Sequence, residues 1–148
     1  MSDQQEATSN SVRALRNSVR FPQLLRAPIF DGYSDQDRTR ILDSARMQFY
    51  RKATDVMHQD AVPDGMFLIA QGEVEVTYIS PLGARTPLLI AHPGMALGLT
   101  ETLAELPCAA TCKASAGTSL LVFDHVQLQL LATDLRFVRN FARNVYES

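Results

Sequence analysis

The feature that most constrains the fold is a run of short strand-like segments between residues 46 and 123, closed by turns rich in glycine or proline. Met66–Ala70 is apolar throughout, and Glu73–Ile79 alternates polar and apolar side chains almost without fault. Alternation with a period of two is typical of a strand with one buried face. Turns at Pro81–Gly83 and Pro93–Gly94 separate these strands from the next ones. We therefore expect a closed or rolled antiparallel β structure.

Further strands and helices follow from shorter signals. Four more segments have strand character: Arg46–Ala53, Leu88–Ile90, Thr111–Lys113 and Thr118–Phe123. Ser34 precedes a segment with acids in its first turn, which predicts a helix that ends near Ala45. Asp124 and Asp134 are each followed by apolar residues at helical spacing, which predicts two C-terminal helices. The expected fold class is mainly β with flanking helices, an antiparallel jelly-roll-like β-roll.

The chain has 148 residues, enough for one domain with a real core and too few for two ordinary ones. Residues 1–11 are polar and are expected to form a flexible tail. Residues 12–148 are expected to form a single domain, with the β-roll at about 46–123 and the C-terminal helices at about 124–147. Helical spacing within 12–25 predicts one more helix before the β-roll.

Bulk properties exclude several classes of function. The formal charge of −2 gives no overall attraction for phosphate backbones, so we expect no direct DNA binding by this chain alone. Residues 1–10 lack the basic start and apolar block of a secretory signal, and no apolar run approaches the roughly 20 residues that cross a bilayer. Two cysteines are too few for a disulfide framework. We expect a cytoplasmic protein with free thiols and no membrane contact.

Catalytic and metal-binding patterns are missing from the sequence. There is no Gly-x-Ser-x-Gly, Walker or His-Glu-x-x-His motif, so we do not expect an enzyme. His58, His92 and His125 are scattered singly, which does not favour a metal or haem site. If Cys108 and Cys112 lay on one extended segment, their Cα atoms would be more than about 12 Å apart, beyond the ~7 Å limit for a disulfide. We interpret them as ordinary thiols and expect no cofactor and no metal.

The stretch Gly94–Ala114 combines a glycine-rich turn, a short segment with helical potential and a run of small residues after Pro107. A turn followed by a helix end exposes backbone N–H groups, which can hold an anionic group. The stretch is therefore the candidate ligand site.

Three motifs make the chain resemble the cyclic nucleotide-binding domain family, the β-roll module of the catabolite activator protein and of the regulatory subunits of cyclic-AMP-dependent kinase. Gly65–Val76 resembles the first family signature, and Leu89–Gly98 resembles the second, with Leu97 in place of phenylalanine. Pro107–Ala114 resembles the end of the family's phosphate-binding cassette. The resemblance spans roughly residues 24–146 and implies a cassette helix that lies over a ligand pocket.

The departures from the family pattern fall on the two residues that hold the ligand. In members that bind cyclic nucleotide, a glutamate follows the cassette glycine and accepts from the ribose 2′-hydroxyl; here Leu99 follows Gly98. An arginine follows the cassette proline and pairs with the cyclic phosphate; here Cys108 follows Pro107. Each charge-assisted hydrogen bond contributes roughly 1.5–3 kcal/mol, so losing both weakens cyclic nucleotide binding by on the order of a hundredfold or more.

The pocket candidates implied by the resemblance are Gly98, Leu99, Thr100, Glu101, Cys108, Ala109, Ala110 and Thr111. Glu101 is two positions beyond Leu99, so on a short helix we expect it to face a different direction from the family's glutamate. Thr111, with the amides of Ala109 and Ala110, could cradle a small anion; alternatively, these residues only begin a strand.

The last helix bears most directly on partners. The residues that we consider for dimer or partner contacts are Leu135, Phe137, Val138, Phe141 and Val145. The resemblance implies that a dimerisation helix begins here, and we expect Phe137, Phe141 and Val145 to form its contacts. The alternative is that this helix only packs back on the β-roll.

The leading hypothesis from the sequence is a non-catalytic regulatory or interaction domain that does not bind cyclic AMP or cyclic GMP in the usual way. It would act through a protein partner or as a homodimer. The alternative is a small-molecule sensor whose remodelled pocket takes a cyclic nucleotide or another ligand. Such a sensor could be the effector half of a catabolite activator-like transcription regulator, although this sequence has no helix-turn-helix domain.

Overall fold

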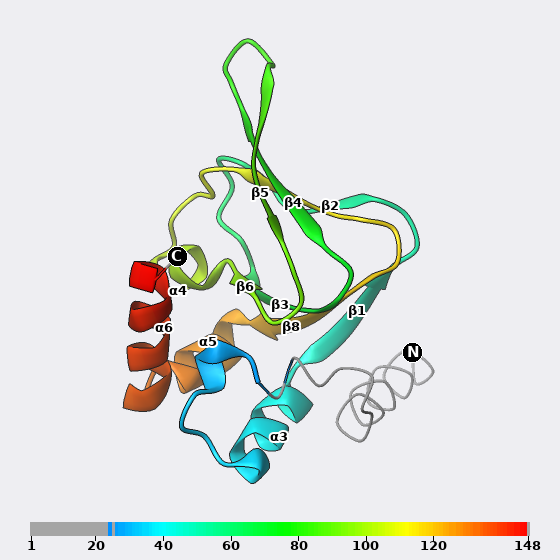
Figure 1. Ribbon diagram of the computed structural model, residues 1–148. Coiled ribbons are helices and arrows are strands. Elements are labelled where there is room, and N and C mark those ends of the chain that lie inside the picture. Colours follow the sequence, from blue (N-terminus) through cyan, green and yellow to red (C-terminus); the bar gives the residue numbers. More distant parts are fainter. Residues whose placement is uncertain (1–23, 25, 148) are drawn as a thin grey trace.

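The computed structural model describes residue 24 and residues 26–147, in which eight strands form two four-stranded antiparallel sheets (Figure 1). The strands are β1 (Arg46–Tyr50), β2 (Thr54–Met57), β3 (Gly65–Gln71), β4 (Val74–Ile79), β5 (Arg85–Ala91), β6 (Ala96–Leu97), β7 (Thr111–Ala114) and β8 (Thr118–Asp124). One sheet has the order β1-β8-β3-β6 and the other β2-β7-β4-β5. The chain passes repeatedly between the two sheets, which confirms the expected β-roll.

Helices flank the sheets, and side-chain caps set the starts of two of them. They are the 3-10 helix η1 (Pro28–Phe30) and the α-helices α3 (Asp35–Ser44), α4 (Leu99–Ala104), α5 (His125–Leu131) and α6 (Leu135–Glu147). The Ser34 hydroxyl accepts from the Asp37 N–H at 3.1 Å. The Asp124 carboxylate accepts from the Gln127 N–H, and the Gln127 side chain accepts from the Asp124 N–H, both at 2.8 Å. These caps confirm the predicted starts of α3 and α5.

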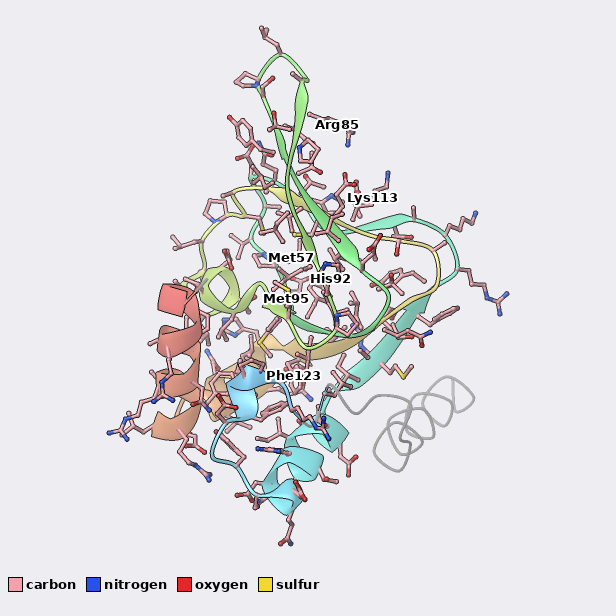
Figure 2. All side chains as sticks on the ribbon, in the orientation of Figure 1. Met57, Arg85, His92, Met95, Lys113 and Phe123 are labelled. Carbon is pink, nitrogen blue, oxygen red and sulfur yellow. The ribbon has the colours of Figure 1, made fainter. Side chains whose placement is uncertain are left out.

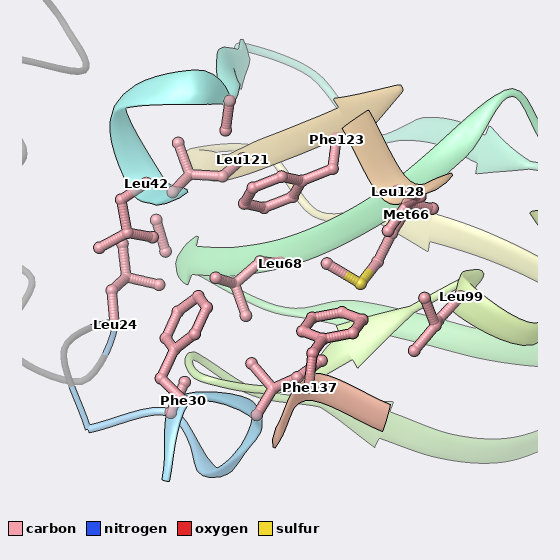
Figure 3. Close-up of a cluster of buried hydrophobic side chains, with 14 of the residues drawn as sticks. Leu24, Phe30, Leu42, Met66, Leu68, Leu99, Leu121, Phe123, Leu128 and Phe137 are labelled. Carbon is pink, nitrogen blue, oxygen red and sulfur yellow. The ribbon is translucent and has the colours of Figure 1, made fainter. Parts of the chain in front are cut away.

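The interior is divided into two clusters of buried apolar side chains. The helix-side cluster joins the helices to one sheet and includes Leu24, Phe30, Leu42, Met66, Leu68, Leu99, Leu121, Phe123, Leu128 and Phe137 (Figure 3). The sheet-side cluster draws on both sheets and consists of Met57, Ile69, Val74, Val76, Ala91, Cys108, Ala110, Cys112, Ala114 and Leu120. Strand β3 supplies both clusters, because successive side chains point to opposite faces. This explains why its sequence is apolar throughout.

The first glycine of the signature Gly65–Val76 is required by close packing of two strands. Gly65 pairs with Asp124 where β3 and β8 meet. A Cβ at Gly65 would lie 2.3 Å from the carbonyl oxygen of Phe123, which is shorter than any real contact of that kind. Only glycine therefore lets β3 approach β8 at this point.

Helix α6 packs against the N-terminal part of the described chain. Phe137 is 1% exposed and belongs to the helix-side cluster. The Asn140 side-chain amide donates to the carbonyl oxygens of Ile29 and Asp31, at 3.0 and 2.8 Å. These bonds satisfy the carbonyl group of Ile29, which is buried, and that of Asp31 just after η1. The orientation of α6 is thus fixed by one aromatic ring and one buried amide.

This packing corrects the expected role of Phe137, because a side chain in the core cannot also contact a partner. Phe141 is partly buried against the same cluster. Leu135 and Val138 remain 59% and 43% exposed. The side chain of Val145 lies outside the described residues.

Several boundaries differ from those expected. β1 ends at Tyr50 rather than Ala53, and β5 begins at Arg85, earlier than the expected Leu88. The strands β2 and β6 were not predicted. The tail at 1–11 and the helix expected within 12–25 fall outside the described residues, apart from Leu24. Among the residues described, no helix combines the length and the apolar character needed to cross a membrane.

Candidate ligand site

The candidate site is built from β6, α4 and β7, which carry the stretch Gly94–Ala114. Gly98 precedes α4 with φ of 86°, a left-handed conformation that favours glycine. A Cβ at Gly98 would lie 3.0 Å from the Gly65 carbonyl oxygen and 3.2 Å from Met57 Sδ. The Gly98 carbonyl oxygen accepts from the Thr102 N–H at 3.0 Å, the first helical bond of α4. This glycine therefore starts the helix and brings it against β3.

The side chains of α4 divide between the core and the surface. Leu99 is 4% exposed and packs in the helix-side cluster, which also holds Met66 and Phe137 (Figure 3). Thr100 is exposed, and Glu101 is half-buried. The position at which the resemblance implies a ribose-binding glutamate is thus a core position here.

The same helix buries a hydroxyl that sequence reasoning did not single out. Thr102 is fully buried, and its Oγ1 atom has no hydrogen-bond partner within the described part of the chain. Thr102 is three positions beyond Leu99, so both lie on the inner face of α4. Nothing in the sequence distinguishes this threonine from the exposed Thr100.

Cys108 is held by backbone hydrogen bonds to the segment after β2. Its N–H donates to the Ala61 carbonyl oxygen at 2.9 Å, and its carbonyl oxygen accepts from the Asp60 N–H at 2.8 Å. Its side chain is 4% exposed and belongs to the sheet-side cluster. The cassette residue that is an arginine in cyclic nucleotide-binding relatives is therefore a buried thiol in a fixed position.

Thr111 bonds to the protein through Gln59, a residue that sequence reasoning missed. The Thr111 Oγ1 atom accepts from the Gln59 N–H at 3.1 Å. The Gln59 side chain then pairs with the backbone of Ile79, donating at 2.7 Å and accepting at 2.8 Å. Thr111 also starts β7, as the strand alternative predicted. Ala110 is buried in the sheet-side cluster, whereas Ala109 is exposed.

The Glu101 carboxylate contributes negative charge at the two thiols of the cassette. Burial raises the pKa of the Cys108 thiol, and the negative charge of Glu101 raises it further. Burial raises the pKa of Cys112 to about 11, with added contributions from Cys108 and Glu101. Both thiols are therefore neutral near pH 7 and lie within the field of the Glu101 carboxylate.

The nearest cation in the sequence does not replace the arginine. Lys113 is exposed on β7, and Figure 2 shows its position on the sheet. It pairs in register with Asp55 of β2 and Glu75 of β4, on the face opposite to Cys112. Its charge is thus directed to neighbouring acids and solvent rather than to the cassette interior.

His125 Nε2 lies 3.9 Å from Glu105 Oε1, and the described residues contain no group of three or more His, Cys, Asp or Glu side chains that could hold a metal ion.

Comparison with known proteins identifies the fold. A family model described as cyclic nucleotide-binding domain matches residues 47–134. A search of curated protein sequences found no match.

Three solved structures illustrate the likeness. The catabolite activator protein of Thermus thermophilus is similar with a TM-score of 0.74 and 21% identity, over 81% of this chain and 57% of that one. The regulatory subunit of a cAMP-independent protein kinase A from Trypanosoma cruzi, bound to guanosine, is similar with a TM-score of 0.67 and 16% identity. The likeness covers 93% of this chain and 51% of that one. A mutant of the corresponding Trypanosoma brucei subunit, bound to cAMP in its A site, is similar with a TM-score of 0.65 and 12% identity. The likeness covers 90% of this chain and 53% of that one. This chain spans little more than half the length of each.

Proposed function

The chain belongs to the cyclic nucleotide-binding domain family, and from that premise we propose that it is a non-catalytic regulatory domain that does not bind cyclic AMP or cyclic GMP in the usual way. It acts through contacts with a protein partner, which can be a second copy of the chain. The observation that carries the proposal is Cys108, a buried neutral thiol at the cassette position where relatives pair an arginine with the cyclic phosphate.

Charge supports this proposal at the phosphate position. A cyclic phosphate carries one negative charge, and its burial needs a compensating cation or several hydrogen-bond donors. Cys108 offers a neutral thiol, and the nearby Glu101 adds a negative charge. Replacing a cation that attracts the phosphate by a carboxylate that repels it should weaken the binding free energy by more than the loss of one hydrogen bond. Such a bond to a charged group is itself worth roughly 1.5–3 kcal/mol.

The packing of Leu99 supports the same proposal at the ribose position. Leu99 is a core residue of the helix-side cluster, so it cannot turn toward a ligand without leaving a cavity among its neighbours. The same side chain links the cassette helix to Phe137 of α6 through that cluster (Figure 3). The residue that relatives use for ligand recognition serves here to pack α4 into the core of the domain.

The partner surface includes the exposed apolar residues of α6. Leu135 and Val138 are large apolar side chains that remain exposed on this helix. Sedimentation velocity tests whether a second copy covers them: a dimer that dissociates in Leu135→Glu/Val138→Glu supports the homodimer. A wild-type monomer at tens of micromolar would leave a different protein as the only partner.

A second candidate function, a sensor for an uncharged nucleoside, is favoured by one specific observation. In the Trypanosoma brucei mutant that bound cAMP, a glutamate was replaced by alanine and a threonine seven positions later by arginine. Glu101 and Cys108 in this chain have the same spacing and, like the unmutated pair, offer an acid and no arginine. The related Trypanosoma cruzi protein was bound to guanosine, a nucleoside without a phosphate. A carboxylate is suited to accept hydrogen bonds from sugar hydroxyls.

Isothermal titration calorimetry with cyclic AMP, cyclic GMP and guanosine separates the two functions. Micromolar binding of either cyclic nucleotide contradicts the leading proposal. Guanosine binding that is lost in Glu101→Gln and kept in Glu105→Gln supports the nucleoside sensor, since Glu105 is an exposed glutamate at the end of the same helix. If none of the three ligands binds, the result favours the leading proposal, a regulatory domain that acts through a protein partner.

A further inference from the structure

Strand β1 has a neighbouring strand on only one side. It forms the edge of the sheet with the order β1-β8-β3-β6. Backbone N–H and C=O groups along such an edge lack a strand to pair with, so the edge is a template for another extended segment. Figure 1 shows β1 and the C-terminal helix α6 on different sides of the molecule. The edge is therefore separate from the exposed apolar residues of α6.

Hydrogen bonds two strands away establish which β1 residues bond to β8. The Ile69 N–H of β3 donates to the Met95 carbonyl oxygen at 3.0 Å, on the β6 side of β3. Leu120 of β8 is opposite Ile69, so this pair is not hydrogen-bonded and Leu120 directs its own backbone groups to β1. There Leu120 is paired with Gln48. Gln48 therefore bonds to β8.

The residues on either side of Gln48 point the other way. Antiparallel residues alternate between bonded and non-bonded pairs, so the N–H and C=O groups of Met47 and Phe49 face the open edge. The Tyr50 carbonyl oxygen accepts from the Gly117 N–H at 2.8 Å, which agrees with this alternation. Within the described part of the chain, the backbone groups of Met47 and Phe49 have no hydrogen-bond partner.

The side chains around this edge are aromatic and basic. Phe49 is 52% exposed. Arg46, Arg51 and Lys52 are exposed as well, and residues 44–54 contain no acid. Among the described residues, none of these three cations takes part in an ion pair. Since the whole chain carries a formal charge of −2, β1 is a positive edge on a slightly acidic protein.

These features select the occupant of the edge. A second copy paired through β1 would bring two sets of cations together, and charged edges of this kind oppose self-association. A phosphate backbone offers acceptors but no donors, so it cannot pair with the free carbonyl groups of Met47 and Phe49. An extended peptide offers alternating donors and acceptors, and acidic side chains match the cations.

We propose that β1 binds an extended acidic segment of a protein partner, which adds to the four-stranded sheet as one more strand. Its backbone bonds to the free groups of Met47 and Phe49, an apolar side chain covers the Phe49 ring, and acidic side chains face the three cations. This inference deepens the proposed partner-binding role and rests on it, but it uses a surface other than α6.

The test is a titration of the full chain with the blocked peptide Glu-Val-Thr-Val-Thr-Val-Glu, followed by amide hydrogen exchange in NMR spectra. Without peptide, the amides of Met47 and Phe49 should exchange fast, whereas β8 protects those of Gln48 and Tyr50. About 1 mM peptide should slow the Met47 and Phe49 amides by about tenfold, which corresponds to a dissociation constant near 0.1 mM. Slow exchange before peptide is added would overturn the proposal, because the edge would already be covered. Unchanged exchange with peptide would overturn it as well.

The charge of the probe separates an acidic strand from other occupants. The peptide Lys-Val-Thr-Val-Thr-Val-Lys keeps the strand pattern and should bind at least about tenfold more weakly, since it meets three cations. Equal affinity for the two peptides would refute the role of charge. Tighter binding of an oligothymidylate than of the acidic peptide would show that the edge binds nucleic acid instead.

Variants locate the binding surface. Arg51→Glu should weaken binding of the acidic peptide by about fivefold. The matched control is Arg85→Glu, because Arg85 is an exposed arginine on β5 of the other sheet (Figure 2). Equal losses in these two variants would contradict binding at β1. Leu135→Glu/Val138→Glu, the variant that tests the homodimer, should bind the peptide with wild-type affinity, so the edge and the α6 surface are tested separately. Loss of peptide binding in that variant would contradict a separate site.

Discussion

Restoring the family's ribose acceptor by Leu99→Glu should unfold much of the protein rather than create a nucleotide site. Leu99 is 4% exposed in the helix-side cluster. Losing its apolar burial costs about 1.5–3 kcal/mol. Keeping the introduced carboxyl neutral at pH 7, against an ordinary pKa near 4.3, adds up to about 3.7 kcal/mol. The sum of roughly 5–7 kcal/mol is comparable to the whole stability of a domain, about 5–15 kcal/mol.

The pH dependence of this variant gives a second signature. The introduced carboxyl has a folded pKa raised above its unfolded value, so the unfolded state loses its proton first as the pH rises. The destabilisation should therefore be smaller at pH 4.5 than at pH 7, by up to about 3 kcal/mol. Urea unfolding followed by far-UV circular dichroism at both pH values measures this difference directly.

Two control variants separate the effect of the carboxyl group from that of changing the side chain at position 99. Thr100→Glu places the same carboxyl on the exposed neighbouring position and should change stability by no more than about 0.5 kcal/mol. Leu99→Met keeps the volume and should cost less than about 1.5 kcal/mol. If Leu99→Glu were as stable as Thr100→Glu at pH 7, or bound cyclic AMP at micromolar concentration, the conclusion that this position belongs to the core would be wrong.

Three further predictions follow from other buried groups. Thr102→Val should raise the free energy of unfolding by about 1 kcal/mol, because it removes a buried hydroxyl without a partner; a loss of stability in chemical denaturation would show that the hydroxyl is satisfied in solution. Asn140→Ala should cost about 2–3 kcal/mol, since it leaves the carbonyls of Ile29 and Asp31 without their donor, and an effect below about 0.5 kcal/mol would contradict this anchoring of α6. Burial and then the Asp134 carboxylate raise the pKa of Tyr33 from near 10 to about 12. Its stabilisation is therefore complete below pH 10 and lost as the pH rises through about 12, so the stability of wild type should fall relative to Tyr33→Phe over this interval, whereas parallel pH profiles would exclude the shift.

The sequence predicted the elements whose signals are local. The alternation of β4 and the caps at Ser34 and Asp124 depend on residues close together in the chain, and all were found where expected. β2 was missed because only four residues form it and two of them are exposed. Its pairing with β7 is made by residues more than fifty positions away. Local patterns carry no information on such a partner.

The buried face of α6 could not be predicted because it contains a polar residue. Leu135 and Val138 are two of the apolar residues that follow Asp134 at helical spacing, and both are exposed. The face that packs inward contains Phe137 and Asn140, and the amide of Asn140 is buried because it meets two backbone carbonyls. Hydrophobic periodicity treats an asparagine as a surface residue, so it does not identify a buried face whose packing depends on a hydrogen bond.

Part of the candidate site was visible in the sequence and part was not. The resemblance located Gly98, Leu99 and Cys108, since the cassette motif is contiguous. It did not show that Leu99 shares a buried cluster with Phe137, that Gln59 binds Thr111, or that Met57 lies opposite Cys112. These contacts join segments far apart in the chain and depend on the order of strands in the two sheets.

Calorimetric titration of the purified wild-type chain with cyclic AMP tests the central claim most directly. With a buried thiol in place of the arginine and the Glu101 charge nearby, we predict no saturable binding up to about 1 mM nucleotide, a free energy weaker than about −4 kcal/mol. The variant Cys108→Ser, which also lacks a cation, should give the same result. A dissociation constant in the micromolar range for the wild-type chain would contradict the account, because it would require a phosphate anchor that Cys108 cannot supply.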